Sequence, residues 1–301
     1  MGAGSLAMKT IGPSNPIRGR YVDVHGRRVH FLEHGDEAAP SVVLLHGCGS
    51  LAQEVLAPLR DTDLRIIAPD RPGYGFSESL ADGRGPLAQS YWLEELIEAL
   101  QLHGLVLAGH SIGCAPLLIL AERRPDLASG LCLIAPFCRP TPEETMLLLR
   151  IAVAPAVGPL FTRYIVQRFA GYFGQRVMRA AHHPNPIPQH LLEFPYRHAA
   201  NYQAICTMAD ELLGFNGDME RASELEIGCP VQVLYGDTDG AVDPHWHLEW
   251  LARRVSQADI TWLEGVGHNP HHAAPDIVCG MVRAMAYSAG KKNHTRLYAN
   301  G

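Results

Sequence analysis

The chain has 301 residues, of which 47% are apolar and 19% are charged. This is ordinary globular usage, so the composition excludes a largely disordered chain and predicts a sizeable buried core. The formal net charge of −6 offers no general cationic face for a phosphate backbone, which disfavours nucleic acid as a partner.

The cysteines and the start of the chain bear on the cellular compartment. Seven cysteines, with no Cys-x-x-Cys pair among them, predict reduced thiols rather than a disulfide framework or a zinc site, which favours a cytoplasmic protein. Residues 1–14 lack the apolar core of a signal peptide, and no stretch approaches the ~18 apolar residues of a membrane span. We therefore expect neither secretion nor membrane association, and we expect residues 1–14 and 291–301 to be flexible ends.

Short runs of Val, Leu and Ile alternate with helical patterns along the chain. This alternation is typical of an α/β fold, in which helices cover both faces of a mostly parallel sheet. An antiparallel hairpin is predicted at residues 21–24 and 29–32, and buried strands are predicted at residues 41–45, 65–68, 105–108, 130–134, 231–235 and 260–263. Functional side chains are expected just after these strands, because ligands bind at the carboxyl ends of strands in open α/β sheets.

Two regions between the strands carry helical patterns. Residues 88–102 place apolar side chains at helical spacing and predict a helix that packs one face on the sheet. The stretch between the strands at 130–134 and 231–235 is too long for a bare loop and contains several amphipathic pieces. We assign residues 137–217 to a helical cap, broken by a proline-rich run at 183–188, and residues 15–136 and 218–290 to the core domain.

The motif GHSIG at residues 109–113 follows the predicted strand at 105–108 and precedes a helix-like segment. Strand, Gly-x-Ser-x-Gly and helix in immediate succession are the context of a nucleophile elbow. Glycine is needed at both flanks because the serine occupies a strained turn, where a nearby Cβ would strike the neighbouring strand or helix. We therefore predict Ser111 as a nucleophile.

A serine hydroxyl needs a histidine to take its proton and a carboxylate to hold the tautomer of that histidine. Asp237 and Asp239 both follow the predicted strand at 231–235, and His268 follows the last predicted strand. The chain order is Ser, then Asp, then His, which differs from the orders of the chymotrypsin and subtilisin classes. The residues alone leave either aspartate open as the acid.

Five segments together resemble signatures of the α/β-hydrolase superfamily: LHG at 45–47, DRPGYGFS at 70–77, GHSIG at 109–113, GDTD at 236–239 and GHNP at 267–270. The resemblance covers about residues 21–287 except the cap. It implies a serine hydrolase that needs no cofactor. It also implies Asp239 as the acid, with Asp237 as the competitor, and the backbone N–H groups of Cys48 and Ile112 as the oxyanion hole.

Further candidates lie near the predicted centre. Positions 46 and 110 usually support loop geometry in this family, so we interpret both histidines mainly as structural. The candidates for substrate contact are His46, His110, Phe137, Phe161 and Tyr164. The aromatic residues at 161–173 are equally compatible with a cap core and with the lining of an apolar pocket.

The remaining histidines and cysteines are interpreted as structural. The chain has sixteen histidines, including the pair His271 and His272, but no His-Glu-x-x-His pattern or comparable array of ligands, so we predict no metal. Cys48 and Cys114 flank the predicted centre and are interpreted as small packing residues.

These observations predict a hydrolase that cleaves a small to medium, apolar carboxylic ester through an acyl-enzyme, with a small molecule as its partner. Carbon–carbon bond hydrolases, thioesterases, amidases and acyltransferases of this superfamily share the same three residue types and remain alternatives. A ligand sensor with little turnover is a further alternative. Ser111 speaks against haloalkane dehalogenase and epoxide hydrolase chemistry, for which an aspartate would stand at this position.

Overall fold

The computed structural model describes residues 15–142, 158–222, 224, 226–255 and 257–299, with the backbone alone for 290–299. Residues 1–14, for which flexibility was expected, and residues 143–157 of the predicted cap lie outside the described residues.

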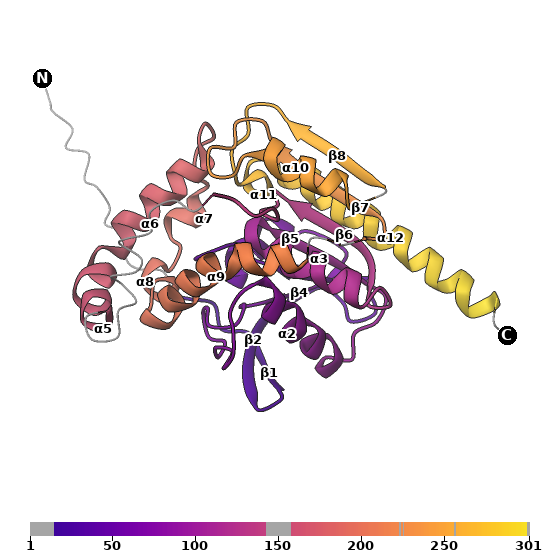
Figure 1. The fold of residues 1–301 in the computed structure, drawn as a ribbon, viewed down its shortest axis with the longest axis horizontal. Helices are drawn as coiled ribbons and strands as arrows, with labels where there is room; N and C mark the ends of the chain where they lie inside the picture. Colours follow the sequence, from indigo (N-terminus) through magenta and orange to yellow (C-terminus); the bar gives the residue numbers. More distant parts are fainter. Residues whose placement is uncertain (1–14, 143–157, 223, 225, 256, 300–301) are drawn as a thin grey trace, which may run out of the picture.

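The centre of the molecule is an eight-stranded, mostly parallel sheet with the strand order β1-β2-β4-β3-β5-β6-β7-β8 (Figure 1). β1 and β2 pair with antiparallel neighbours, and the other strands are parallel, which confirms the predicted α/β fold class. The strands are β1 (Arg20–Val24), β2 (Arg27–His34), β3 (Ser41–Leu45), β4 (Arg65–Pro69), β5 (Leu105–His110), β6 (Ala128–Ile134), β7 (Val231–Gly236) and β8 (Ala258–Leu263).

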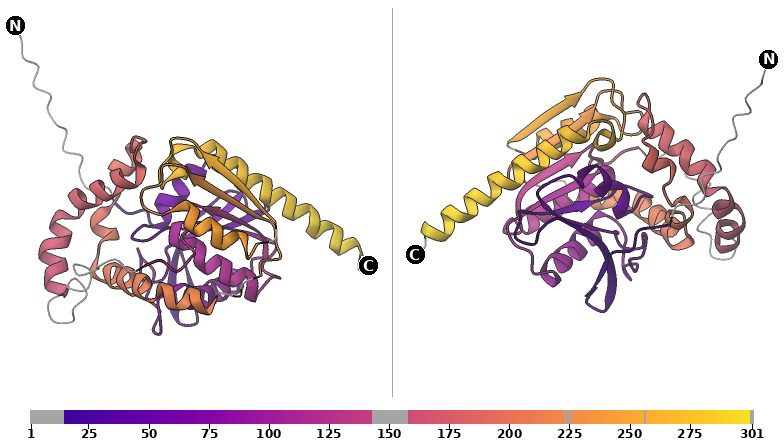
Figure 2. Two further views of the ribbon diagram at one scale, coloured as in Figure 1. Left: turned by 45° about the horizontal axis from the view of Figure 1, so that its top comes forward. Right: turned by 180° about the vertical axis from the view of Figure 1, so that it is seen from behind.

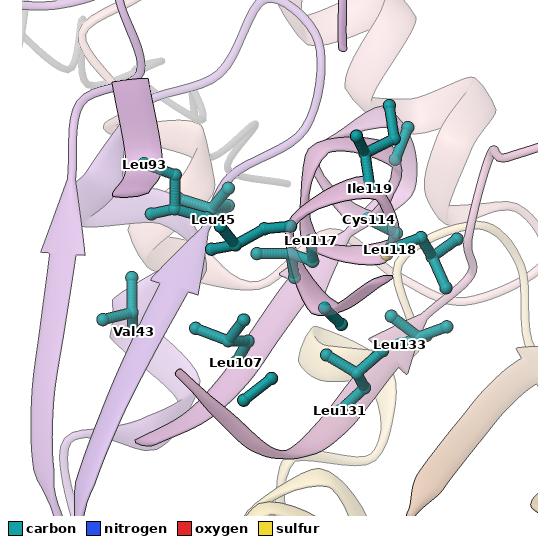
Figure 3. Close-up of a cluster of buried hydrophobic side chains, with 14 of the residues drawn as sticks. Val43, Leu45, Leu93, Leu107, Cys114, Leu117, Leu118, Ile119, Leu131 and Leu133 are labelled. Carbon is teal, nitrogen blue, oxygen red and sulfur yellow. The ribbon is translucent and has the colours of Figure 1, made fainter. Parts of the chain in front are cut away.

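Two apolar layers cover the sheet, because successive residues of a strand point to opposite faces. Val43 and Leu45 of β3 pack with the helices α2 and α3, as Figure 3 shows. The alternate residues Val42 and Leu44 pack with α1 and α12 on the other face. The core helices are α1 (Ala52–Leu56), η1 (Ala57–Leu59), α2 (Pro86–Ala99), η2 (Ser111–Gly113), α3 (Cys114–Arg123), α10 (Pro244–Ala252), α11 (Pro270–Ala273) and α12 (Pro275–Ala299).

Two elements differ from the sequence-based expectation. β8 was expected to be buried, but its side chains Ile260 and Trp262 are more than one third exposed. The reason is that β8 is the last strand of the sheet and is bonded to β7 on one side only. The polar segment from residue 291 was expected to be flexible, but it continues α12 as helix to Ala299, since no proline interrupts the chain after Pro275. Among the described residues, no helix combines the length and apolar character needed to cross a bilayer.

Between β6 and β7 the chain forms a set of helices; the earlier ones lie at one end of the molecule, and the last one runs back alongside the core (Figures 1 and 2). They are α5 (Gly158–Phe161), the π-helical turn η3 (Thr162–Val166), α6 (Gln167–His182), α7 (Gln189–Leu192), α8 (Tyr196–Ala199) and α9 (Tyr202–Arg221). The proline-rich run separates α6 from α7, as expected. α9 continues past the assigned boundary at 217, and its residues Phe215 and Met219 belong to the core cluster with α2 and α3.

Candidate active site

Ser111 stands in a sharp turn between β5 and α3. Its φ is +55°, a backbone conformation that costs free energy for any residue with a Cβ, so the strained turn predicted from GHSIG is present. A Cβ at Gly113 would lie 2.6 Å from the carbonyl oxygen of His46, and a Cβ at Gly109 would lie 2.8 Å from Leu117. Both glycines are therefore required by close packing around the serine.

A chain of hydrogen bonds joins Ser111, His268 and Asp239. The Oγ of Ser111 lies 3.0 Å from Nε2 of His268, and Nδ1 of His268 lies 2.7 Å from Oδ2 of Asp239. The carboxylate of Asp239 is fully buried, and its Oδ1 accepts the N–H groups of Ala241 and Val242 at 2.9 Å each. These bonds fix the orientation of the carboxylate toward Nδ1 of His268, while Nε2 of the same ring faces the serine hydroxyl, which is the geometry of a serine–histidine–aspartate triad.

Asp237, the other candidate for the acid, makes different contacts. Oδ1 of Asp237 accepts the N–H of Gly265 at 2.7 Å in an exposed turn, and thereby supports the loop that leads from β8 to His268. Of the two aspartates that follow β7, the structure thus brings Asp239 to the histidine.

The loop after β3 passes directly beside Ser111. A Cβ at Gly47 would lie 3.4 Å from Cβ of Ser111, which places the next residue, Cys48, at the edge of the turn. Burial raises the pKa of the Cys48 thiol to about 12, so this sulfur stays protonated and is a poor nucleophile. The Cys114 thiol donates to the carbonyl of Gly109 at 3.1 Å, and burial raises its pKa as well. Both cysteines fit the packing role that was predicted.

The rings of His46 and His110 form hydrogen bonds with backbone groups. Nε2 of His46 accepts the N–H of Arg71 at 2.9 Å, and its Nδ1 donates to the carbonyl of Gly47 at 2.8 Å. Nε2 of His110 donates to the carbonyl of His268 at 2.9 Å. Each histidine therefore ties two active-site loops together, which agrees with their interpretation as supports of loop geometry.

A fully buried ion pair, which sequence reasoning missed, links α9 of the inserted helices to the loop after β3. Arg71, which follows β4, pairs with Glu211 of α9, and neither side chain has any exposure. Nη2 of Arg71 also donates to the carbonyl of Gly47 at 3.0 Å, and Tyr74 donates to Glu211 at 2.8 Å. Gln89 bonds both members of the pair. Burial alone would lower the pKa of Arg71, but the carboxylate of Glu211 raises it, so the guanidinium stays charged.

The carboxyl end of α6 contacts the loop that carries His268. The N–H of His268 donates to the carbonyl of Ala181 at 2.8 Å. The side chain of Asn185 accepts the N–H of Gly267 at 3.2 Å and donates to the carbonyl of Gly265 at 3.0 Å. The inserted helices thus take part in positioning His268, a role that no motif in the sequence indicates.

Three buried side chains near the centre could hold a metal ion. The ligand atoms of Glu54, His271 and His272 all lie within 4.8 Å of one another. Oε1 of Glu54 is 2.9 Å from His271 Nε2 and 2.7 Å from His272 Nε2, and Ser50 donates to its other oxygen at 2.8 Å. Burial alone would raise the pKa of Glu54, but the two imidazoles hold it well below its ordinary value. This network satisfies the carboxylate without an ion, and the absence of a metal stays a prediction.

The three aromatic candidates for substrate contact have different surroundings. Phe137 follows β6, donates its N–H to the carbonyl of Ser111 at 3.1 Å, and packs its ring 4.5 Å from Phe215. Phe161 is half-buried, whereas Tyr164 is 62% exposed and so does not line an enclosed pocket. A hollow of about 460 Å³ is lined by Ser129 near the start of β6 and by Pro230 and Gln257, which precede β7 and β8, so it lies at the amino ends of these strands and away from Ser111.

The buried histidines predict how stability depends on pH. Burial lowers the pKa of His46 and of His247 to about 4, below the ordinary value of 6.5, so the folded protein favours their neutral forms. Between pH 6.5 and 4 the unfolded chain therefore binds more protons than the folded protein. The stability that these neutral histidines contribute is fully present above pH 6.5 and is lost as the pH falls toward 4. At pH 5 each histidine is expected to lower the free energy of unfolding by up to ~2 kcal/mol, measured by urea denaturation at pH 7 and pH 5.

A variant separates this effect from general acid destabilisation. Nδ1 of His247 accepts the N–H groups of Cys138 and Arg139, and an amide oxygen can accept in its place. His247→Asn should therefore reduce the loss of stability between pH 7 and pH 5, while His103→Asn at an exposed position should leave it unchanged. Equal pH dependence in all three proteins would contradict the prediction.

A strained serine after the central strand, bonded through histidine to a buried aspartate at the carboxyl ends of a mostly parallel sheet, defines the α/β-hydrolase class. Sequence comparison agrees. The chain belongs to the alpha/beta hydrolase family, which matches residues 42–280.

Similar proteins include an uncharacterized protein of Mycobacterium tuberculosis, which is 27% identical over 84% of this chain and 76% of its own length. The pimeloyl-[acyl-carrier protein] methyl ester esterase of Aromatoleum aromaticum is 28% identical over 79% of this chain and 94% of its own length. Among solved structures, a putative lipase from Acinetobacter baumannii superposes with a TM-score of 0.71 at 20% identity, over 91% of this chain and 92% of the other. This structural similarity to the lipase shows that the two chains share a fold.

Proposed function

We propose that this protein is a serine hydrolase that cleaves a small to medium, apolar carboxylic ester. The observation that carries the proposal is Ser111 at a strained turn with its Oγ 3.0 Å from Nε2 of His268, which Asp239 holds from the other side. A methyl ester esterase among the relatives supports an ester as the substrate class.

The proposed reaction has two stages. Ser111 Oγ attacks the ester carbonyl while His268 takes its proton, and Asp239 stabilises the imidazolium. The N–H groups of Cys48 and Ile112 hold the negative charge that develops on the carbonyl oxygen, which is typically worth ~3 kcal/mol for each donor. The C–O bond then breaks as His268 returns the proton to the leaving alcohol. Water, deprotonated by the same histidine, hydrolyses the acyl-serine and releases the carboxylic acid.

The partner in this proposal is a small-molecule substrate, and the compartment is the cytoplasm. All seven cysteines are free thiols in the structure, which supports a reducing compartment.

The test combines covalent labelling with turnover. A fluorophosphonate probe should label the wild-type protein at Ser111, and short p-nitrophenyl esters should release p-nitrophenol rapidly. Ser111→Ala should abolish the labelling and lower turnover by several orders of magnitude, because no nucleophile remains at the turn. Cys48→Ala is the matched control, since only the backbone N–H of this residue takes part. Labelling of the wild type without turnover of any ester would favour a ligand sensor and overturn the proposal.

A further inference from the structure

The outer side of the cap carries an unusual concentration of apolar side chains. Of the sixteen large hydrophobic side chains that are exposed in the described residues, seven lie between residues 158 and 182, and each is 45% to 69% exposed. We call this set the outer face: Leu160, Tyr164, Ile165, Phe169, Tyr172, Phe173 and Val177. Figure 2 shows that α5 and α6 form the outer end of the cap.

α6 is oriented opposite to the usual amphipathic helix of a globular protein, which turns its apolar side inward. Its inward side carries small or polar residues: Ala170 and His182 are buried, and a Cβ at Gly174 would lie 2.2 Å from the ring of Tyr196. Its outward side carries Phe169 and Phe173. The exposed apolar side chains are therefore not displaced members of the core, because the inward side has no room for them.

Within the segment that carries the outer face, the Asp, Glu, Lys and Arg side chains are all arginines. Residues 158–192 contain Arg163, Arg168, Arg176 and Arg179 but no aspartate or glutamate, in a chain whose net charge is −6. All four arginines are exposed, and the guanidinium groups of Arg163 and Arg176 lie 5.7 Å and 5.8 Å from the rings of Tyr164 and Tyr172. Large apolar residues flanked by cations are typical of a helix that lies in the interface of an anionic bilayer.

We infer that the outer face docks this protein on anionic phospholipid bilayers, with α5 and α6 parallel to the membrane plane. The aromatic and aliphatic side chains enter the boundary between headgroups and acyl chains, and the arginines contact the phosphates. This proposal differs from the sequence-based expectation of no membrane association, which rested on the lack of a spanning segment and of a signal peptide. A helix that lies in the interface needs neither.

The test uses the full chain with the Ser111→Ala substitution, so that hydrolysis plays no part and the result is independent of the proposed function. Flotation with phosphatidylcholine vesicles containing about one third phosphatidylglycerol should recover the protein with the vesicles, whereas pure phosphatidylcholine vesicles should bind it weakly. Arg168→Gln/Arg176→Gln/Arg179→Gln should weaken binding to the anionic vesicles roughly 100-fold, since each arginine contributes about 1 kcal/mol near such a surface. High salt should have a similar effect.

Phe169→Ser/Phe173→Ser tests the apolar part and should weaken binding at least about tenfold. Ile277→Ser, at a comparably exposed apolar position on α12, is the matched control and should bind as before. Unchanged circular dichroism and thermal unfolding would show that the variants fold. Four results would overturn the inference. They are no binding to anionic vesicles, equal binding to both kinds of vesicle, a dimer in light scattering that Phe169→Ser/Phe173→Ser dissociates, and a loss of folding stability in that variant, which would assign the face to contacts within this chain.

Discussion

Asp239→Asn is expected to lower kcat for p-nitrophenyl ester hydrolysis by about 10⁴-fold. An asparagine keeps an oxygen for the N–H groups of Ala241 and Val242, so the loop can retain its shape. Its amide group, however, would donate to Nδ1 of His268 where the carboxylate accepts. The imidazole would then carry its proton on Nε2, the atom that faces Ser111, and could no longer take the proton of the serine.

Asp237→Asn is the matched comparison, because both aspartates follow the same strand and both accept backbone N–H groups. The amide oxygen can still accept from Gly265, so kcat should fall by less than about tenfold. Steady-state kinetics on both variants, with thermal unfolding as the check on folding, decides between them. A larger loss in Asp237→Asn than in Asp239→Asn would show that the acid is assigned to the wrong residue.

Glu211→Gln is expected to lower the free energy of unfolding by about 3–5 kcal/mol. The substitution keeps the size of the side chain but removes the charge opposite Arg71, whose guanidinium has no exposure to water. A buried cation without its partner costs far more than the pair contributes, because its hydration has been lost and no opposite charge compensates for it. Urea denaturation of the purified protein measures the change.

The neighbouring residue supplies the control. Asp210 pairs with Arg84, but its side chain is 49% exposed, so Asp210→Asn should change the free energy of unfolding by less than about 1 kcal/mol. The two substitutions remove the same charge from adjacent positions of α9 and differ in burial. If Glu211→Gln were as mild as Asp210→Asn, the ion pair would not stabilise the contact between cap and core.

Most of the sheet could be predicted from the sequence because its strands are continuous runs of Val, Leu and Ile, a pattern produced by burial on both faces. β3 has the predicted bounds, and the other strands differ by a few residues at their ends. The turn at Ser111 could be predicted because its requirement is local. The two glycines that the turn needs, Gly109 and Gly113, lie in the same five-residue motif as the serine. β8 was misjudged because its apolar residues resemble those of a buried strand, and only the strand order shows that it lies at an edge.

The parts of the site that sequence reasoning missed depend on contacts between distant segments. Arg71 was noticed only as part of a motif, and nothing near Glu211 indicates its partner 140 residues away. The choice between Asp237 and Asp239 required the family pattern, because two residues of separation after the same strand cannot show which side chain reaches His268. The aromatic residues at 161–173 were compatible with a cap core and with a pocket lining. The amphipathic pattern shows which side of α6 is apolar, but it does not show whether that side points toward the protein or toward solvent.

The contact between α6 and the His268 loop limits how this scaffold can change. Ala181 and Asn185 belong to the inserted helices, yet they bond the backbone of residues 265–268. An exchange of the insertion for that of another hydrolase would therefore also remove part of the support of the backbone at His268. A chimera that alters substrate preference should keep the segment from Ala181 to Asn185 and vary the helices before it. In this protein, the same insertion that forms the outer helices also supports the backbone on which His268 stands.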